Sequence, residues 1–157
     1  MYNMKMEHEN ITQTSYVACK NRARKLVMER LRIYQPVIGV EFARVSIKDM
    51  SSRWGSCSSK NNLNFHYKIV FLPLELADYI IVHELCHLIE MNHSYRFWAL
   101  VRKAIPDYRK RILEIRRVEK ESFKEYQTRP RLRKRIRRVS AHTIIRRKLR
   151  ALINLSF

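Results

Sequence analysis

Residues 74–90 read LELADYIIVHELCHLIE, and this stretch decides the fold of the chain. Apolar residues lie on nearly every face of a helix drawn over it, which predicts a central, buried helix. The ionisable side chains of His83, Glu84 and His87 lie close together within this apolar stretch. Burying such groups without partners costs several kcal/mol, and a metal ion would offset that cost directly. The helix is therefore a candidate metal site.

Residues 83–87 form the pattern H-E-x-x-H. Two imidazoles four residues apart lie on one helical face, so both can reach a single ion. Glu84 points roughly 100° around the helix, where a base can take a proton from metal-bound water. The pattern predicts a hydrolytic zinc site with His83 and His87 as ligands and Glu84 as the catalytic base.

A catalytic zinc ion takes three protein ligands and leaves a fourth position open. His93 is the expected third ligand, at the spacing found in metzincins, although Glu90 stands where those proteins have glycine. A straight helix would carry His93 about 9 Å past His87. The chain must therefore turn, and Met91-Asn92 is the expected turn because Asn readily adopts left-handed backbone. Glu90 stays an alternative, either as a ligand or as a carboxylate that holds an imidazole.

Upstream of this helix, the sequence predicts one amphipathic helix and a small sheet. The helix covers Tyr16–Leu31, and Pro36 and Gly39 break the pattern. Apolar residues alternate over 41–48 and 63–71, and 53–57 reads as a short strand between them. Residues 58–62 have turn chemistry, since Asn tolerates positive φ. We expect an antiparallel hairpin or meander.

Two further helices are expected downstream. Ser94 can cap a helix over Tyr95–Ile105, with Phe97, Trp98, Val101 and Ile105 facing inward. Pro106 ends it, and Asp107 can cap a charged helix that reaches about Glu125.

The segment Arg53-Trp54-Gly55-Ser56-Cys57 has two interpretations. In the structural one, Trp54 anchors the core and Gly55 permits a bulge or tight packing. In the functional one, an edge strand pairs with an extended substrate, which Gly55 allows to approach closely. Arg53 is then a candidate for holding a carboxylate or polarising a carbonyl, so Arg53 and Gly55 are candidate substrate-binding residues.

Composition predicts a soluble, cytoplasmic, folded protein. The length of 157 residues suits one core, and 46% hydrophobic residues exclude a disordered chain. The opening residues lack the apolar segment of a signal peptide, and no apolar run approaches the roughly 18–20 residues that span a membrane. Three scattered cysteines without a C-x-x-C pair argue against disulfides and a thiolate zinc site.

The formal charge of +19 is concentrated at the C-terminal end. Residues 126–157 hold eleven Arg or Lys residues and no acidic residue, which separates a basic helical tail from a domain at residues 1–125. Its amphipathic pattern fits packing on the domain, phosphate binding in a nucleic acid, or binding to an anionic membrane or acidic protein. The candidate nucleic-acid-binding residues are Arg133, Lys134, Arg135, Arg137, Arg138, Arg146, Arg147 and Lys148.

The chain resembles the YgjP-like metallopeptidase family, which is related to the WLM and SprT-like zincins. Five segments over about residues 16–120 carry the resemblance: Arg53–Cys57, His83–His87, Asn92-His93-Ser94, Phe97-Trp98 and Pro106-Asp107-Tyr108. It implies a minimal zincin-like α+β fold, in which a small antiparallel sheet packs on a buried active-site helix. It also implies one zinc ion on His83, His87 and His93, with Glu84 as general base.

Two functions remain open at this point. One is a zinc metallopeptidase acting on peptides or proteins, and the other is a nucleic-acid-binding protein with a structural zinc site. Glu84 favours the peptidase, because a structural site needs no base.

Overall fold

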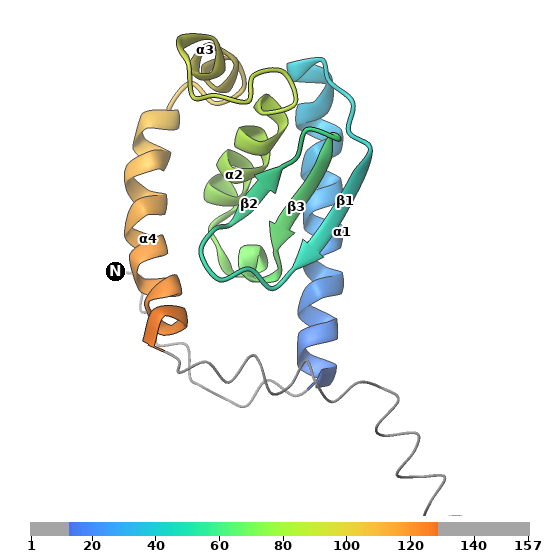
Figure 1. Ribbon diagram of the computed structural model, residues 1–157, viewed down its shortest axis with the longest axis vertical. Helices are drawn as coiled ribbons and strands as arrows, with labels where there is room; N and C mark the ends of the chain where they lie inside the picture. Colours follow the sequence, from blue (N-terminus) through green and yellow to red (C-terminus); the bar gives the residue numbers. More distant parts are fainter. Residues whose placement is uncertain (1–12, 129–157) are drawn as a thin grey trace, which may run out of the picture. The chain divides into compact units, whose positions relative to one another are not determined.

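The computed structural model of the chain describes residues 13–128 and has the expected α+β architecture (Figure 1). Its elements are, in chain order, α1 (Gln13–Ile38), β1 (Arg44–Lys48), β2 (Gly55–Cys57), β3 (Asn62–His66), the 3-10 helix η1 (Tyr67–Phe71), α2 (Leu74–Cys86), α3 (Tyr95–Ala104) and α4 (Tyr108–Thr128). The chain divides into two compact units, Met1–Phe123 and Lys124–Phe157. The tail predicted from residue 126 lies almost entirely outside the described residues. No helix within 13–128 is both long and apolar enough to cross a membrane.

The prediction of an antiparallel sheet is wrong for one of the two strand pairings. β2 and β3 form an antiparallel pair, but β1 pairs with β3 in parallel, giving the order β1-β3-β2. After β1, the chain crosses to the far side of the sheet, forms β2, and returns as β3 between the two. Sequence proximity suggested a meander, whereas burial of Leu63 and Phe65 on β3, opposite Val45 and Ile47, favours β3 in the centre.

The β2–β3 turn forms as expected, with Asn61 in the left-handed region at φ 54°. The predicted strand 63–71, however, ends at His66. The His66 Nδ1 atom accepts a hydrogen bond from the Lys68 amide at 2.9 Å, so the backbone turns into η1 instead of continuing the ladder. Tyr67 and Ile69 are still buried, but Phe71 is 44% exposed.

Helix α1 extends beyond the predicted range and past Pro36 to Ile38. Gly39, at φ 79°, ends it and donates its amide to the Gln35 carbonyl at 2.8 Å. The break predicted at Pro36 therefore lies at the glycine, because a proline in the last turn loses only one hydrogen bond.

An ion pair fixes α1 against α2. Arg30 donates two hydrogen bonds to the buried Asp78, at 2.6 and 2.7 Å, and the Tyr34 hydroxyl donates a third at 2.9 Å. Because paired groups no longer carry the desolvation cost alone, Asp78 can occupy the apolar helix. The sheet lies across α1 and α2 (Figure 1), with β2 against α2. This contact brings the segment 53–57 to the face of α2 that carries Glu84.

Candidate metal centre

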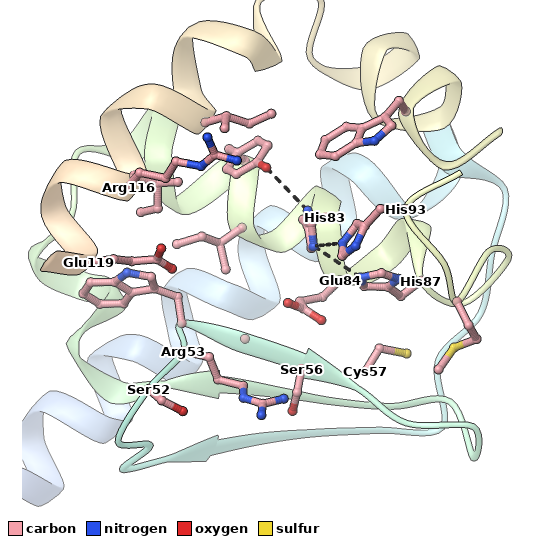
Figure 2. Close-up of a pocket in the computed structure, with 18 residues that line it drawn as sticks. Ser52, Arg53, Ser56, Cys57, His83, Glu84, His87, His93, Arg116 and Glu119 are labelled. Atoms are coloured by element: carbon pink, nitrogen blue, oxygen red, sulfur yellow. Dashed lines mark hydrogen bonds between the residues drawn. The ribbon is translucent and has the colours of Figure 1, made fainter. Parts of the chain in front are cut away.

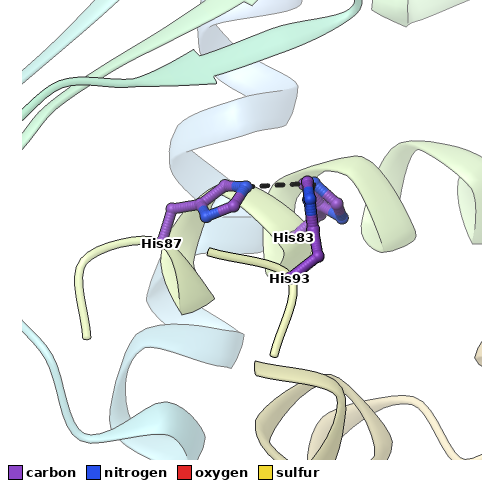
Figure 3. A group of neighbouring side chains, drawn as sticks. All are labelled: His83, His87 and His93. Atoms are coloured by element: carbon purple, nitrogen blue, oxygen red, sulfur yellow. Dashed lines mark hydrogen bonds between the residues drawn. The ribbon is translucent and has the colours of Figure 1, made fainter. Parts of the chain in front are cut away.

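Three imidazoles meet at the C-terminal end of α2 (Figure 3). The Nε2 atom of His83 lies 3.2 Å from Nε2 of His87 and 3.0 Å from Nε2 of His93. Among the described residues, these three form the one group of His, Cys, Asp or Glu side chains close enough to share a metal ion, with ligand atoms within 4.8 Å of one another. The three histidines predicted from the sequence are thus brought together.

The other ring nitrogens of the two helical histidines have partners of their own. His87 Nδ1 lies 3.0 Å from the main-chain carbonyl oxygen of Glu90. Because a carbonyl only accepts, Nδ1 carries the proton and Nε2 keeps a free lone pair. His83 Nδ1 lies 3.5 Å from the Tyr79 hydroxyl, one turn earlier on α2. Glu90 therefore contacts an imidazole through its backbone, not through the carboxylate considered from the sequence.

The surroundings keep the imidazoles of His83 and His87 neutral. Burial, together with the neighbouring His87 and His93, lowers the pKa of His83 to about 3. Burial also lowers the pKa of His87. A neutral imidazole is the form that binds a metal, so these two histidines keep ligand atoms available at neutral pH.

A tight turn returns His93 to the helix end. α2 ends at Cys86, earlier than the predicted Glu90, and the amides of Leu88 and Ile89 bond to carbonyls three residues back. Asn92 does not have the expected positive φ, since Asn61 is the one such non-glycine residue in the described part of the chain. The turn is instead spread over residues 87–92. Ser94 caps α3 as predicted, its hydroxyl accepting from the Phe97 amide at 3.3 Å.

Glu84 is buried between α2 and strand β2 (Figure 2). Burial raises the pKa of its carboxyl to about 8, against an opposing effect of Arg53. Its Oε2 atom is buried without a hydrogen-bond partner among residues 13–128. A buried carboxyl oxygen without a partner is costly, which suits a group that acts on a bound molecule.

Gly55 makes room for this carboxyl. A Cβ atom at position 55 would lie 2.6 Å from Glu84 Oε1 and 2.7 Å from its Cγ. The close approach that the sequence suggested at Gly55 is therefore made by Glu84. The neighbouring Trp54 is buried against His66 and Phe123, as expected of a core anchor.

The cluster opens into a cavity of about 690 Å³. All six residues predicted for the catalytic, metal and substrate sites line it: Arg53, Gly55, His83, Glu84, His87 and His93. Sequence reasoning missed Tyr79, although its spacing of four residues before His83 placed it on the same helical face. It also missed the wall formed by Ile112, Ile115, Arg116 and Glu119 of α4, which no local pattern connects to α2.

The residues present fit a zinc ion. Zinc binds histidine nitrogen at about 2.0–2.1 Å in a tetrahedron, which sets neighbouring ligand nitrogens about 3.3 Å apart. The observed separations of 3.0 and 3.2 Å are close to this value. Three imidazoles without a thiolate also match the donor set of catalytic sites. Cys19, Cys57 and Cys86 are free cysteines in the described part of the chain; Cys86 is buried, and the other two are half-buried rather than fully packed.

Comparison with protein families gives a match over residues 2–118 to the model described as YgjP-like, metallopeptidase domain. Comparison with curated proteins gives no match.

Two solved structures are similar to the chain. One is the metallopeptidase zymogen abylysin of Pyrococcus abyssi, with 25% identity, a TM-score of 0.50, and coverage of 56% of this chain and 92% of that one. The other is the metallopeptidase zymogen jannalysin of Methanocaldococcus jannaschii, with 27% identity, a TM-score of 0.49, and coverage of 60% and 88%.

Proposed function

Because the chain belongs to the YgjP-like metallopeptidase family, we propose that it hydrolyses peptide bonds with one zinc ion held by His83, His87 and His93. Glu84 is the general base. The observation that carries the proposal is the histidine cluster itself: Nε2 of His83 lies 3.0 and 3.2 Å from the Nε2 atoms of His93 and His87. Beside it lies the buried Glu84, whose Oε2 atom has no hydrogen-bond partner in the described chain.

Each residue has a definite task in this proposal. A bound zinc ion would activate a water molecule, polarise the substrate carbonyl and favour the ionised form of Glu84. Glu84 takes a proton from the attacking water and delivers it to the leaving amine nitrogen. Tyr79 and the Glu90 carbonyl orient the imidazoles of His83 and His87.

The substrate is an extended polypeptide lying along β2. This strand forms an edge of the sheet, since it pairs only with β3 among the described strands. Its free edge can add a substrate strand by main-chain hydrogen bonds. Arg53, exposed at the start of this edge, lines the cavity and is suited to hold a carboxylate or the scissile carbonyl. Gly55 keeps the strand close to Glu84.

The test measures metal content and hydrolysis together. Elemental analysis of the untagged protein should give about one zinc per chain, and His93→Ala should lose most of it. A set of fluorogenic peptides then reports cleavage, which should require the metal. A well-folded wild-type protein that takes up no added zinc would overturn the proposal.

The basic tail supports a second activity, binding of a polyanion such as a nucleic acid. Eleven positive charges in 32 residues, without an acidic one, would neutralise phosphates. Removing residues 129–157 should abolish salt-dependent DNA or RNA binding and leave peptide cleavage intact. Equal binding by the truncated chain would contradict this assignment.

A further inference from the structure

The third histidine of the cluster is held differently from the other two. His83 lies on α2 and His87 caps its C-terminal end, and each has a partner for its Nδ1 atom. His93 lies in the exposed turn before α3, and its one hydrogen-bond contact among the described residues is Nε2 to Nε2 of His83. Ligating imidazoles usually have a hydrogen bond on the second nitrogen that fixes the ring. Another interaction must therefore orient His93.

Ring stacking supplies that interaction. The indole of Trp98 stacks on the His93 imidazole, with ring centroids 5.7 Å apart and an interplanar angle of 24°. Tyr108 also stacks on the indole, with ring centroids 5.4 Å apart and an interplanar angle of 19°. Trp98 also meets the edge of the His83 ring at 6.3 Å. Aromatic pairs in this range attract each other and restrict ring rotation.

We infer that Trp98 is a positioning residue for His93, which holds the imidazole in the orientation that completes the histidine cluster. Tyr108, the first residue of α4, stacks on the indole and supports it in turn. The inference rests on the proposed metal site, and it adds a residue that does not itself offer a ligand atom.

The geometry favours this role over simple packing. Trp98 is only half-buried and lines the cavity, whereas the fully buried residues of α3 are Phe97 and Val101. The Phe97 ring lies nearly perpendicular to the His93 ring, at 4.7 Å and 87°, whereas the indole lies nearly parallel to it. A face-to-face neighbour is needed to fix the plane, and Trp98 is that neighbour.

The test compares zinc affinity in the full chain by competition with a chelator. Trp98→Leu removes the ring and keeps an apolar side chain, and it should weaken zinc binding about 10- to 100-fold. Trp98→Phe keeps a stacking ring and should restore most of the affinity. Val101→Ala is the matched control, because it creates a cavity on the same helix and should lower thermal stability without changing zinc affinity.

A double-mutant cycle shows whether the effect passes through His93. His93→Ala lowers zinc affinity by itself, and Trp98→Leu should add little to it if the indole acts only on His93. The absorption spectrum of bound Co²⁺ adds a readout of ligand geometry. It should change in Trp98→Leu and resemble that of wild type in Trp98→Phe and Val101→Ala.

The outcomes separate this inference from the proposed function. If wild type and Trp98→Leu bind zinc equally well, the positioning role is wrong and the metal site stands. If Trp98→Leu weakens binding equally with and without His93, the indole does not act through that ligand, and the inference also fails. If the folded wild type binds no zinc, both the site and the inference are overturned.

Discussion

The two halves of the histidine cluster are built in different ways. The helix half consists of His83 and Glu84 on α2 and of His87, the residue that caps its C-terminal end; Glu84 is buried, and the two histidines are half-buried. The loop half consists of His93, the Trp98 indole that stacks on it, and Ser94, which caps the helix that carries Trp98. Helical spacing alone aligns the first half, whereas contacts between separate elements align the second. We therefore expect changes in the helix half to alter chemistry most, and changes in the loop half to alter metal affinity.

Glu84→Gln should have the largest effect. The amide keeps the shape of the side chain but cannot take a proton, so kcat should fall about 10²- to 10⁴-fold. Zinc content should remain near one per chain, because Glu84 is outside the group of possible ligands. Glu75→Gln, at the exposed start of the same helix, is the control and should change neither quantity. Full activity in Glu84→Gln would show that Glu84 is not the general base.

The same variant should change how stability depends on pH in the metal-free protein. Burial raises the pKa of Glu84 from 4.5 to about 8, so the folded state holds the proton more tightly than the unfolded state. This stabilisation is complete below pH 4.5 and is lost as the pH rises towards 8, at about 1.4 kcal/mol per unit of pKa difference.

Glutamine does not titrate, so the free energy of unfolding of Glu84→Gln does not fall in this way as the pH rises. Urea unfolding should find Glu84→Gln more stable than wild type by a few kcal/mol at pH 9, with a much smaller advantage at pH 4.5. The two proteins are otherwise identical in sequence, so the contributions of the other titratable groups to the pH dependence largely cancel. A difference between the two proteins that is constant with pH would show that Glu84 has an ordinary pKa.

A smaller effect is expected from Gly55→Ala. This substitution is on strand β2, directly opposite the Glu84 side chain of the helix half. The new methyl group would overlap Glu84, so the carboxyl must move or the strand must shift. Displacing a catalytic group by about 1 Å can cost on the order of 10²-fold, and we expect kcat to fall about 10- to 100-fold.

Gly39→Ala is the matched control, since the sequence has two glycines. A methyl group at Gly39 meets nothing within 4 Å, but φ of 79° strains an alanine. That variant should lose about 1 kcal/mol of stability with unchanged kcat. If both variants lose stability and keep the kcat of wild type, the close approach of Gly55 does not determine the catalytic position of Glu84.

The helix half of the site could be predicted from the sequence more completely than the loop half. Periodicity placed His83, Glu84 and His87 on a buried helix because all three lie within two turns of one another. The β2–β3 turn was predictable for the same local reason, through the tolerance of Asn61 for positive φ. His93 could be selected by its spacing, although the turn that brings it back was expected at Asn92.

Features that depend on distant segments were not predictable. The parallel β1–β3 pairing depends on which apolar strand gains most from a central position. The stack of Trp98 on Tyr108, and the wall that Arg116 and Glu119 add to the cavity, depend on the placement of α4 against α2 and α3. No local pattern in the sequence connects these residues, so they required the structure.

The smallest effect is expected in the loop half, from Ser94→Ala. The Ser94 hydroxyl accepts the Phe97 amide, and losing such a cap typically costs about 1 kcal/mol. Because α3 carries Trp98 and begins directly after His93, fraying of its first turn should also weaken zinc binding by a few-fold. Calorimetric titration with zinc measures this change, and kcat at saturating zinc should stay close to wild type. Ser59→Ala, in the exposed turn before β3, is the control and should leave zinc affinity unchanged. If Ser94→Ala lowered kcat as much as Gly55→Ala, then the loop half would contribute to catalysis directly, and the division between the two halves would fail.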